Sequence, residues 1–378
     1  MEKYSAFRDP GTGIQPFLTP VPPIGSEILA KITLPFGYII GSLRTVLILA
    51  LGLAYVALVR GVCLALSPVP PLYRLVTGGL TSIISRLILL LVGVWWIPVE
   101  LVTRKRGRTA QSNESWNPQT GDIIVSNWVS WIEILWLAFR FNPTFVLPVC
   151  EPVEIPVQSV RASASITHTP GRRTGTGSAA LSSPNRTPST RKSVTGFQAV
   201  SLLSILSATG RVPPYNSNMT PCTLEEIRQA ADRPIVVFPE CTTSNGRGML
   251  RFADAFKDYS VPVKGFKVFI MCVRYDPPTN LSPTLSHSIP SLSLNPLPHL
   301  LKLTTALRPQ PISIRLLSPS ESPSFQLFMV SEVVLNADGQ DVLSEACAAL
   351  IAQIGKMKRT GMGWEDKVAF LDFYRSKK

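Results

Sequence analysis

The sequence is poor in the residues on which metal centres and disulfide scaffolds depend. Only six of its 378 residues are cysteines, and no two of them form a Cys-x-x-Cys pair. This scattered spacing fits neither a disulfide framework nor a zinc site, and it favours a reducing compartment. The three histidines, His168, His287 and His299, lie in Pro-, Ser- and Thr-rich surroundings. We therefore expect no metal site in this protein.

Acidic residues are missing from one long stretch of a chain that carries a net charge of +13. Seven arginines and lysines, but no Asp or Glu, lie between Glu154 and Glu225, and a second basic cluster occupies residues 104–108. Basic clusters beside apolar segments favour anionic lipid surfaces by about 1 kcal/mol per residue. The basic tract has no interleaved aromatic residues, so we expect anionic membrane lipid, and not nucleic acid, as a partner.

Hydrophobic periodicity is missing from residues 157–193, which are rich in Ser, Thr, Pro and Arg. Such a segment cannot bury enough apolar surface to offset its ordering entropy, so we predict a disordered basic insertion. Its Ser-Pro and Thr-Pro sites are either phosphorylation sites or part of a tolerated surface loop. Residues 1–30 form a polar, Pro-rich N-terminal tail that has no secretory signal. Residues 104–156 and 194–378 remain for the folded domain.

Long apolar runs are concentrated near the N-terminus of a chain that is 45% hydrophobic. One run covers residues 32–66 and a second covers residues 75–102, where Trp95 and Trp96 suit a membrane interface. We predict a membrane-embedded hairpin of one or two spans over residues 31–103, with both ends in the cytosol. A pair of buried core helices is the alternative.

Strand-like and helix-like segments alternate after the hairpin, which predicts an α/β fold with a mixed sheet flanked by helices. Residues 277–311 look weakly structured, and Thr223 with Glu226 forms a capping-box pattern. The expected strands cover residues 121–126, 145–149, 234–238, 268–275 and 325–335. The expected helices cover residues 131–141, 196–209, 342–357 and 364–374.

Polar residues crowd the loop that follows the predicted strand 234–238. Residues 238–247 are Phe-Pro-Glu-Cys-Thr-Thr-Ser-Asn-Gly-Arg. In open α/β sheets, ligands bind outside the carboxyl ends of the strands. Hydroxyls and loop amides can orient an anionic ligand there, and Arg247 can bind two phosphate oxygens at once. The alternative for Arg247 is a solvent-facing side chain in a turn.

A second polar segment, Asn127-Trp-Val-Ser130-Trp-Ile-Glu133, follows the predicted strand 121–126. Together the two segments resemble the His-x4-Asp and FPEGT blocks of the glycerolipid acyltransferases, including the Asn that usually precedes the histidine. Trp128 stands where the family has its catalytic histidine, and Glu133 stands at the aspartate. Cys241 replaces the glycine of the FPEGT block.

The resemblance implies transfer of a fatty acyl group from acyl-CoA, as co-substrate, to a lysophospholipid, without a further cofactor. The chain looks most like the fungal branch of lysophosphatidic acid:oleoyl-CoA acyltransferases linked to lipid droplets and vacuolar sorting. Phosphatidic acid would then be the product. That branch implies the endoplasmic reticulum membrane, the lipid droplet or both, with the catalytic domain facing the cytosol.

The resemblance also assigns roles to individual residues. Glu240 and Thr242 match the phosphate block, and Arg274 lies in a segment similar to the family's last block. An ion pair with Asp276 is the alternative for Arg274. The expected phosphate-binding residues are Glu240, Thr242, Thr243, Arg247 and Arg274.

The expected catalytic residues are Asn127, Ser130 and Glu133. Indole is only a hydrogen-bond donor, so Trp128 cannot act as a base. Glu133 could do so if burial raised its pKa. The alternative for Glu133 is a glutamate favoured by the helix dipole, and the alternative for Ser130 is a helix N-cap.

Two other interpretations stay open. One is a catalytically impaired protein of acyltransferase fold that binds phospholipid or acyl-CoA in lipid-droplet or trafficking machinery. The other is an unrelated membrane-anchored α/β protein.

Overall fold

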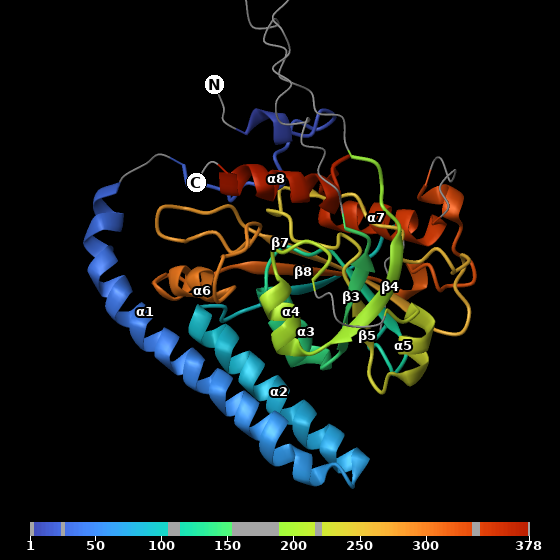
Figure 1. The fold of residues 1–378 in the computed structure, drawn as a ribbon, viewed down its shortest axis with the longest axis horizontal. Coiled ribbons are helices and arrows are strands. Elements are labelled where there is room, and N and C mark those ends of the chain that lie inside the picture. The colour runs from blue at the N-terminus through green and yellow to red at the C-terminus, as the bar shows by residue number, and fades with distance from the viewer. Residues whose placement is uncertain are drawn as a thin grey trace, which may run out of the picture.

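A computed structural model describes residues 4–23, 27–104, 114–152, 189–215, 221–334 and 341–376. The fold is α/β, as predicted (Figure 1). Its strands are β1 (Val99–Val102), β2 (Ile123–Ser126), β3 (Thr144–Cys150), β4 (Val194–Val200), β5 (Ile235–Val237), β6 (Gly248–Met249), β7 (Val268–Tyr275), β8 (Ile312–Leu317) and β9 (Lys358–Arg359). Its helices are α1 (Glu27–Tyr55), α2 (Pro70–Val92), α3 (Ile132–Phe141), α4 (Leu202–Ala208), α5 (Leu224–Ala230), α6 (Leu297–Thr304), α7 (Val342–Gly355) and α8 (Trp364–Ser376).

Seven strands form one mixed sheet in the order β1-β8-β7-β2-β5-β3-β4. The four central strands β7, β2, β5 and β3 are parallel, whereas β4 and β8 run antiparallel to their neighbours β3 and β7. Parallel strands are buried on both faces, and so they consist of nearly continuous apolar runs. The three residues of β5, for example, are all buried. The loops after these strands all leave the sheet at the same edge.

Helices cover both faces of the sheet. Ile124 and Val236 belong to a core cluster that they share with residues of α2, α3, α4 and α6. Ile123 and Val237 point to the other face and pack in a cluster with residues of α7. Neighbouring residues of one strand therefore serve two separate cores, as the alternation along a strand requires.

Helices α1 and α2 run side by side along the lower left of the molecule and form a hairpin (Figure 1). By length and composition, Ile32–Leu66 and Pro70–Val92 are both long and apolar enough to cross a membrane. Helix α2 packs on α3, and α1 packs on α6, where the Arg44 guanidinium donates to the carbonyl oxygens of Thr304 and Ala306. Only 11% of the apolar window of α1 is buried, so α1 is not a buried core helix.

The second apolar segment leaves the hairpin earlier than predicted. Gly93 has φ of 100°, a left-handed conformation that ends α2 at Val92. Residues 99–102, assigned from the sequence to the hairpin, instead form β1, which pairs in parallel with β8 at the edge of the sheet.

Three further predictions about elements are wrong. Residues 196–209 were expected to form one helix, but they form the end of β4 and then the short helix α4. No strand forms at 325–334 in the described part of the chain, and β8 takes that place in the sheet at Ile312–Leu317. Helix α6 lies within the segment expected to be weakly structured.

The N-terminal tail packs against the domain. Phe7 and Phe17 are buried, and both rings contact Phe370 of α8. The Asn245 amide donates to the carbonyl oxygens of Gln15 and Leu18. Residues 4–23 and α8 therefore lie together over the loop that follows β5.

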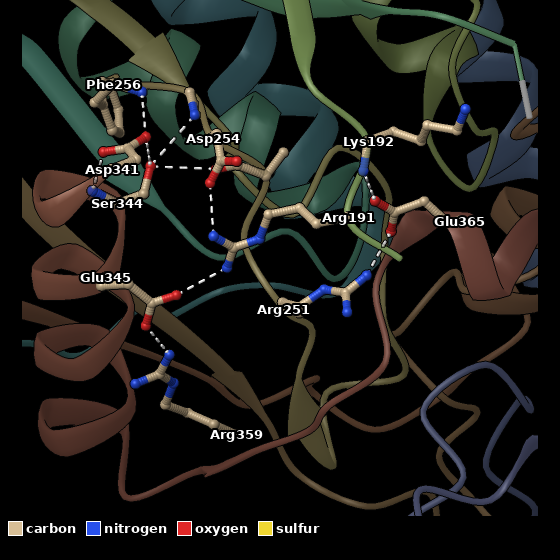
Figure 2. Close-up of polar contacts among 12 residues, drawn as sticks. Arg191, Lys192, Arg251, Asp254, Phe256, Asp341, Ser344, Glu345, Arg359 and Glu365 are labelled. Carbon is tan, nitrogen blue, oxygen red and sulfur yellow. Dashed lines mark hydrogen bonds and ion pairs between the residues drawn. The ribbon is translucent and has the colours of Figure 1, made fainter. Parts of the chain in front are cut away.

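Residues 157–188 of the predicted insertion lie outside the described residues, but its last five residues, 189–193, contact the domain (Figure 2). The Arg191 guanidinium forms ion pairs with Asp254 at 2.6 Å and with Glu345 at 2.8 Å. The backbone amide of Lys192 donates to the Glu365 carboxylate. These contacts hold the end of the insertion against the domain before β4 begins.

Candidate functional site

Three loops meet at the edge of the sheet where the parallel strands end. The first follows β2 and contains residues 127–131, the second follows β5 and contains residues 238–247, and the third follows β7 after Tyr275. Strand β2 lies between β5 and β7, so the three loops are neighbours. This edge is where α/β sheets bind ligands, and the structure brings both motif segments to it.

Glu133, in the first turn of α3, is buried and holds the loop before it. One carboxylate oxygen accepts hydrogen bonds from the backbone amides of Val129 (2.6 Å) and Ser130 (2.5 Å). The other oxygen accepts a hydrogen bond from the Tyr275 hydroxyl at the end of β7. Burial raises the pKa of Glu133 to about 7, although these hydrogen bonds act in the opposite direction. A carboxyl group with this pKa can exchange a proton near neutral pH.

Trp128, at the family's histidine position, is a core residue. Its side chain is fully buried and stacks on Phe238, with ring centroids 5.0 Å apart. The indole Nε1 donates to the Ser130 carbonyl oxygen at 3.2 Å. The backbone amide of Trp128 donates to the Glu240 carboxylate at 3.1 Å. Trp128 therefore joins the loop after β2 to the loop after β5.

Asn127 and Ser130 occupy different environments. The Asn127 amide exchanges two hydrogen bonds with the backbone of Val273, at 2.8 and 3.0 Å, and so fixes the loop to β7. The Ser130 hydroxyl is buried without a hydrogen-bond partner among the described residues. Its side chain does not cap α3, whose N-cap residue is Trp131, so the N-cap alternative is wrong.

Glu240, the acidic residue of the FPEGT-like block, is also buried. Its two carboxylate oxygens accept hydrogen bonds from the backbone amides of Trp128 and Leu250, both at 3.1 Å. Burial raises the pKa of Glu240 to about 8, the nearby charge of Glu133 adds to the increase, and Lys367 opposes it. Glu240 thus ties its own loop to the loop after β2 and to the chain at Leu250, from inside the protein.

Thr242 and Thr243 are buried, and their hydroxyls are engaged by the fold. They donate to the carbonyl oxygens of Arg211 and His287, respectively, both at 2.6 Å. Lys367 of α8, which is fully buried, donates to the Thr242 hydroxyl at 2.8 Å and to the Thr243 carbonyl oxygen at 2.7 Å. Burial lowers the pKa of Lys367. Sequence analysis placed Lys367 in the expected helix 364–374 and gave it no role in a site.

Arg247, in the loop after β5, and Arg274, near the end of β7, line one cavity of about 400 Å³. Lys356 and Lys358, which follow α7, line the same cavity, so four basic side chains converge on it. Tyr275 lines it as well, and its hydroxyl contacts Glu133. Asp276 also lines the cavity, so basic side chains outnumber acidic ones there by four to one. The cavity therefore has the charge to attract a phosphate, and one of its walls, at Tyr275, leads to a buried carboxyl group.

Two buried histidines contact the loop after β2: the His287 backbone amide donates to the Val129 carbonyl oxygen, and the His299 ring contacts Trp131. The sequence analysis gave neither histidine a role. The rings of His287 and His299 stack 4.7 Å apart, and His299 Nδ1 accepts a hydrogen bond from the Trp131 indole at 2.9 Å. Burial lowers the pKa of His287 to about 4 and that of His299 to about 3, so both are neutral at pH 7. Among the described residues, no group of three or more His, Cys, Asp or Glu side chains could hold a metal ion.

The chain is similar in sequence to a distantly related curated protein. The chain is 23% identical over 380 residues to a Schizosaccharomyces pombe protein named "Putative lysophosphatidic acid:oleoyl-CoA acyltransferase". The similarity covers the whole of this chain and 99% of that protein, so it includes the apolar helices α1 and α2 as well as α8. No family model matches the chain. No solved structure matches it either.

Proposed function

We propose that the protein is a membrane-bound acyltransferase that moves a fatty acyl group from acyl-CoA to lysophosphatidic acid and so forms phosphatidic acid. One observation carries the proposal. Tyr275 lines the basic cavity and donates its hydroxyl hydrogen bond to Glu133, so an anion site and a buried carboxyl group of raised pKa are joined. Full-length similarity to a protein named for this reaction supports it.

In this proposal the basic cavity binds the acceptor phosphate. Arg247 and Arg274 are exposed side chains that can each form paired hydrogen bonds with phosphate oxygens. Lys356 and Lys358 add positive charge from the other side of the cavity. Glu240, Thr242 and Thr243, expected from the sequence to bind phosphate, act here by holding the loop that carries Arg247.

Glu133 accepts the proton of the acceptor hydroxyl through Tyr275 in this proposal. The hydroxyl oxygen attacks the thioester carbonyl carbon and forms the new ester bond, while the carbon–sulfur bond breaks and coenzyme A leaves as the thiolate. Tyr275 passes its own proton to Glu133 and receives the hydroxyl proton, and the thiolate is protonated afterwards. General-base assistance of this kind contributes about 10²–10⁴-fold to a rate. Asn127 and Ser130 keep the loop in place beside Glu133.

The apolar outer faces of α1 and α2 support membrane attachment, because two helices of this length and composition can enter a bilayer. We propose that they place the basic cavity next to the lipid surface, where anionic lipid is also bound. The endoplasmic reticulum or the lipid droplet as the compartment, with the domain in the cytosol, stays a prediction from the sequence.

Trp128 favours a second candidate function. Its buried, stacked indole fills the position of the family's base and leaves no room for a water or substrate there. A protein that binds lysophospholipid or acyl-CoA without turnover would need the same basic cavity. The two functions differ only in whether Glu133 and Tyr275 move a proton.

The test is acyl transfer from labelled oleoyl-CoA to lysophosphatidic acid by the purified full chain in detergent. Glu133→Gln should lower turnover about 10²–10⁴-fold, and Tyr275→Phe should lower kcat with little change in KM. Tyr259→Phe is a matched control, because the Tyr259 hydroxyl also donates to a glutamate, Glu225, away from the proposed site. Turnover that survives Glu133→Gln would contradict the mechanism. No wild-type turnover, with activity gained in Trp128→His, would favour the binding protein.

A further inference from the structure

A second cavity, of about 610 Å³, lies directly beside the basic cavity. Its walls come from residues 19–22 of the N-terminal tail, the first half of α1, residues 278–284 and the end of α6. Pro20, Pro278 and Thr284 line both cavities. The two spaces are therefore neighbours that share one wall, at the place where the N-terminal tail crosses the loop after β7.

Apolar side chains dominate the surface of the second cavity. Val21, Leu281 and Leu307 contribute from three separate segments, and Leu34 and Tyr38 contribute from α1. Leu34 and Tyr38 are also 48% and 60% exposed, so they belong to the outer apolar face of α1 as well. The cavity thus connects a surface suited to hydrocarbon with the basic cavity.

Close contacts between α1 and the end of α6 fix the position of α1, which forms one wall of the second cavity. A Cβ atom on Gly37 or Gly41 would lie 2.8 Å from an atom of Thr305, so α1 touches the end of α6 closely at these two glycines. The Arg44 guanidinium holds the next turn of α1 to the carbonyl oxygens of Thr304 and Ala306. The cavity lies N-terminal to this contact, between α1 and residues 278–284.

Two cationic side chains, Lys302 and Arg308, also line the second cavity. Both are long, so their stems can lie along apolar surface while their charged ends stay in water or beside lipid head groups. An uncharged fatty chain between them would bring no repulsion, whereas the phosphate of the same lipid would be attracted to the four basic residues of the neighbouring cavity. The pair of cavities matches a ligand that is anionic at one end and apolar at the other.

We propose that the second cavity holds the single acyl chain of a lysophospholipid whose phosphate lies in the basic cavity. The lipid would enter sideways from the bilayer along α1, with Thr284 at the junction between chain and head group. The assignment of the phosphate rests on the proposed function, but the place of the chain rests on the shared wall of the two cavities. The chain site accounts for the acceptor being a lysophospholipid and not glycerol phosphate alone.

Binding of lysophosphatidic acids of increasing chain length, from hexanoyl to tetradecanoyl, to the full chain held in amphipol tests this inference, with the free lysolipid kept in water below its critical micelle concentration so that each chain passes from water into the cavity. Each methylene that enters the cavity should strengthen binding, by at most about fourfold. Leu281→Trp and, as a second variant on the loop after α6, Leu307→Trp should remove this gain and leave hexanoyl binding within about twofold, because both residues line the second cavity and neither lines the basic cavity. Leu292→Trp is the matched control, because Leu292 is 82% exposed and lines neither cavity.

A chain-length series that is unchanged in both loop variants overturns the inference, and so does a flat series in the wild type. A third arm replaces the lysolipid with acyl-CoA of the same chain lengths. Loss of the gain for acyl-CoA alone would assign the cavity to the donor chain and also overturn the inference. If the wild-type protein shows no acyl transfer but binds longer lysophosphatidic acids more tightly, the chain site is supported and the proposed function is refuted. If the protein shows acyl transfer but the two variants keep the wild-type dependence on chain length, the proposed function is supported and the chain site is refuted.

Discussion

The side chains that surround Trp128 explain how the two loops keep their shape with an indole at this position. The indole stacks on Phe238 and donates to the Ser130 carbonyl oxygen, and the backbone amide beside it reaches Glu240. A histidine is smaller and would leave part of this space empty, at a cost in packing. Trp128 therefore supplies a rigid contact between the two loops, and in the proposed mechanism Glu133 is the group that accepts the proton.

Glu240 should make the stability of the protein depend on pH. Its pKa is raised from 4.5 to about 8 in the folded state, so the folded protein holds a proton that the unfolded chain releases. The contribution is fully present below about pH 4.5 and is lost as the pH rises towards 8. We expect the unfolding free energy of wild type, measured relative to Glu240→Gln by urea denaturation, to fall between pH 5 and 8.

Glu225→Gln provides the control for this measurement. Arg228 lowers the pKa of Glu225 to about 2, so Glu225 is ionised in the folded and unfolded states throughout the same pH range. The stability difference between wild type and Glu225→Gln should then be independent of pH. A difference for Glu240→Gln that is equally flat would show that Glu240 is ionised in the folded protein.

The sequence was enough to place some of these residues and not others. Glu133 and Glu240 follow apolar strands, so their common location at the sheet edge could be predicted from local pattern. Tyr275 is 142 residues away from Glu133, and Lys367 is 125 residues away from Thr242. Contacts of this range depend on how strands and helices assemble, and no local pattern encodes them.

At the scale of elements, long strands and helices with flanking signals were predicted well. Strand β7 and helix α3 have the expected bounds to within one residue, and the capping box of Thr223 and Glu226 is confirmed. The prediction of one helix over residues 196–209 was wrong. It rested on the helical spacing of Phe197 and Val200, but residues 194–200 form β4 and pair with β3. Tertiary pairing overrides local periodicity at such an edge.

The contact between α1 and α6 should tolerate no added methyl group. In Gly41→Ala the new Cβ would lie 3.0 Å from the Cα of Thr305 and 2.8 Å from its Cγ2. Overpacking of this kind costs about 1–3 kcal/mol. Gly52→Ala is the matched control in the same helix, because nothing lies within 4 Å of its Cβ position. It should gain about 0.5–1 kcal/mol from helix propensity.

Thermal unfolding in detergent, followed by circular dichroism, would compare these two variants with wild type. The expected order of melting temperatures is Gly52→Ala above wild type and Gly41→Ala below it. Equal effects of the two substitutions would mean that α1 does not rest on Thr305 in solution.

At the scale of the whole molecule, α1 and α2 run along the lower left, and α8 lies at the top (Figure 1). Many apolar side chains of α1 and α2 are exposed. Soluble monomers rarely expose an apolar surface of this extent. The basic cavity adjoins the cavity beside α1, because the two share one wall. Sequence patterns predicted the apolar helices, but this arrangement depended on the packing of α2 on α3.

Attachment to membranes should therefore resist salt. The apolar faces of α1 and α2 would enter hydrocarbon, whereas screening at high ionic strength weakens only the attraction between charges. In flotation assays we expect the full chain to rise with phosphatidylcholine vesicles at about 0.1 M and about 1 M NaCl alike. Anionic lipid in the vesicles should add to binding only at the lower salt concentration. Release from neutral vesicles at high salt would contradict attachment through the helices.

Lys367 also has a consequence for the order of events during synthesis. The ribosome makes α1 and α2 first, so the apolar hairpin can meet a bilayer before any strand of the sheet exists. Helix α8 is made after the strands that the structure describes, and its Lys367 supplies an ammonium group that Thr242 and Thr243 contact. A nascent chain would thus present its two apolar helices early, and the loop after β5 would gain its contacts with Lys367 last.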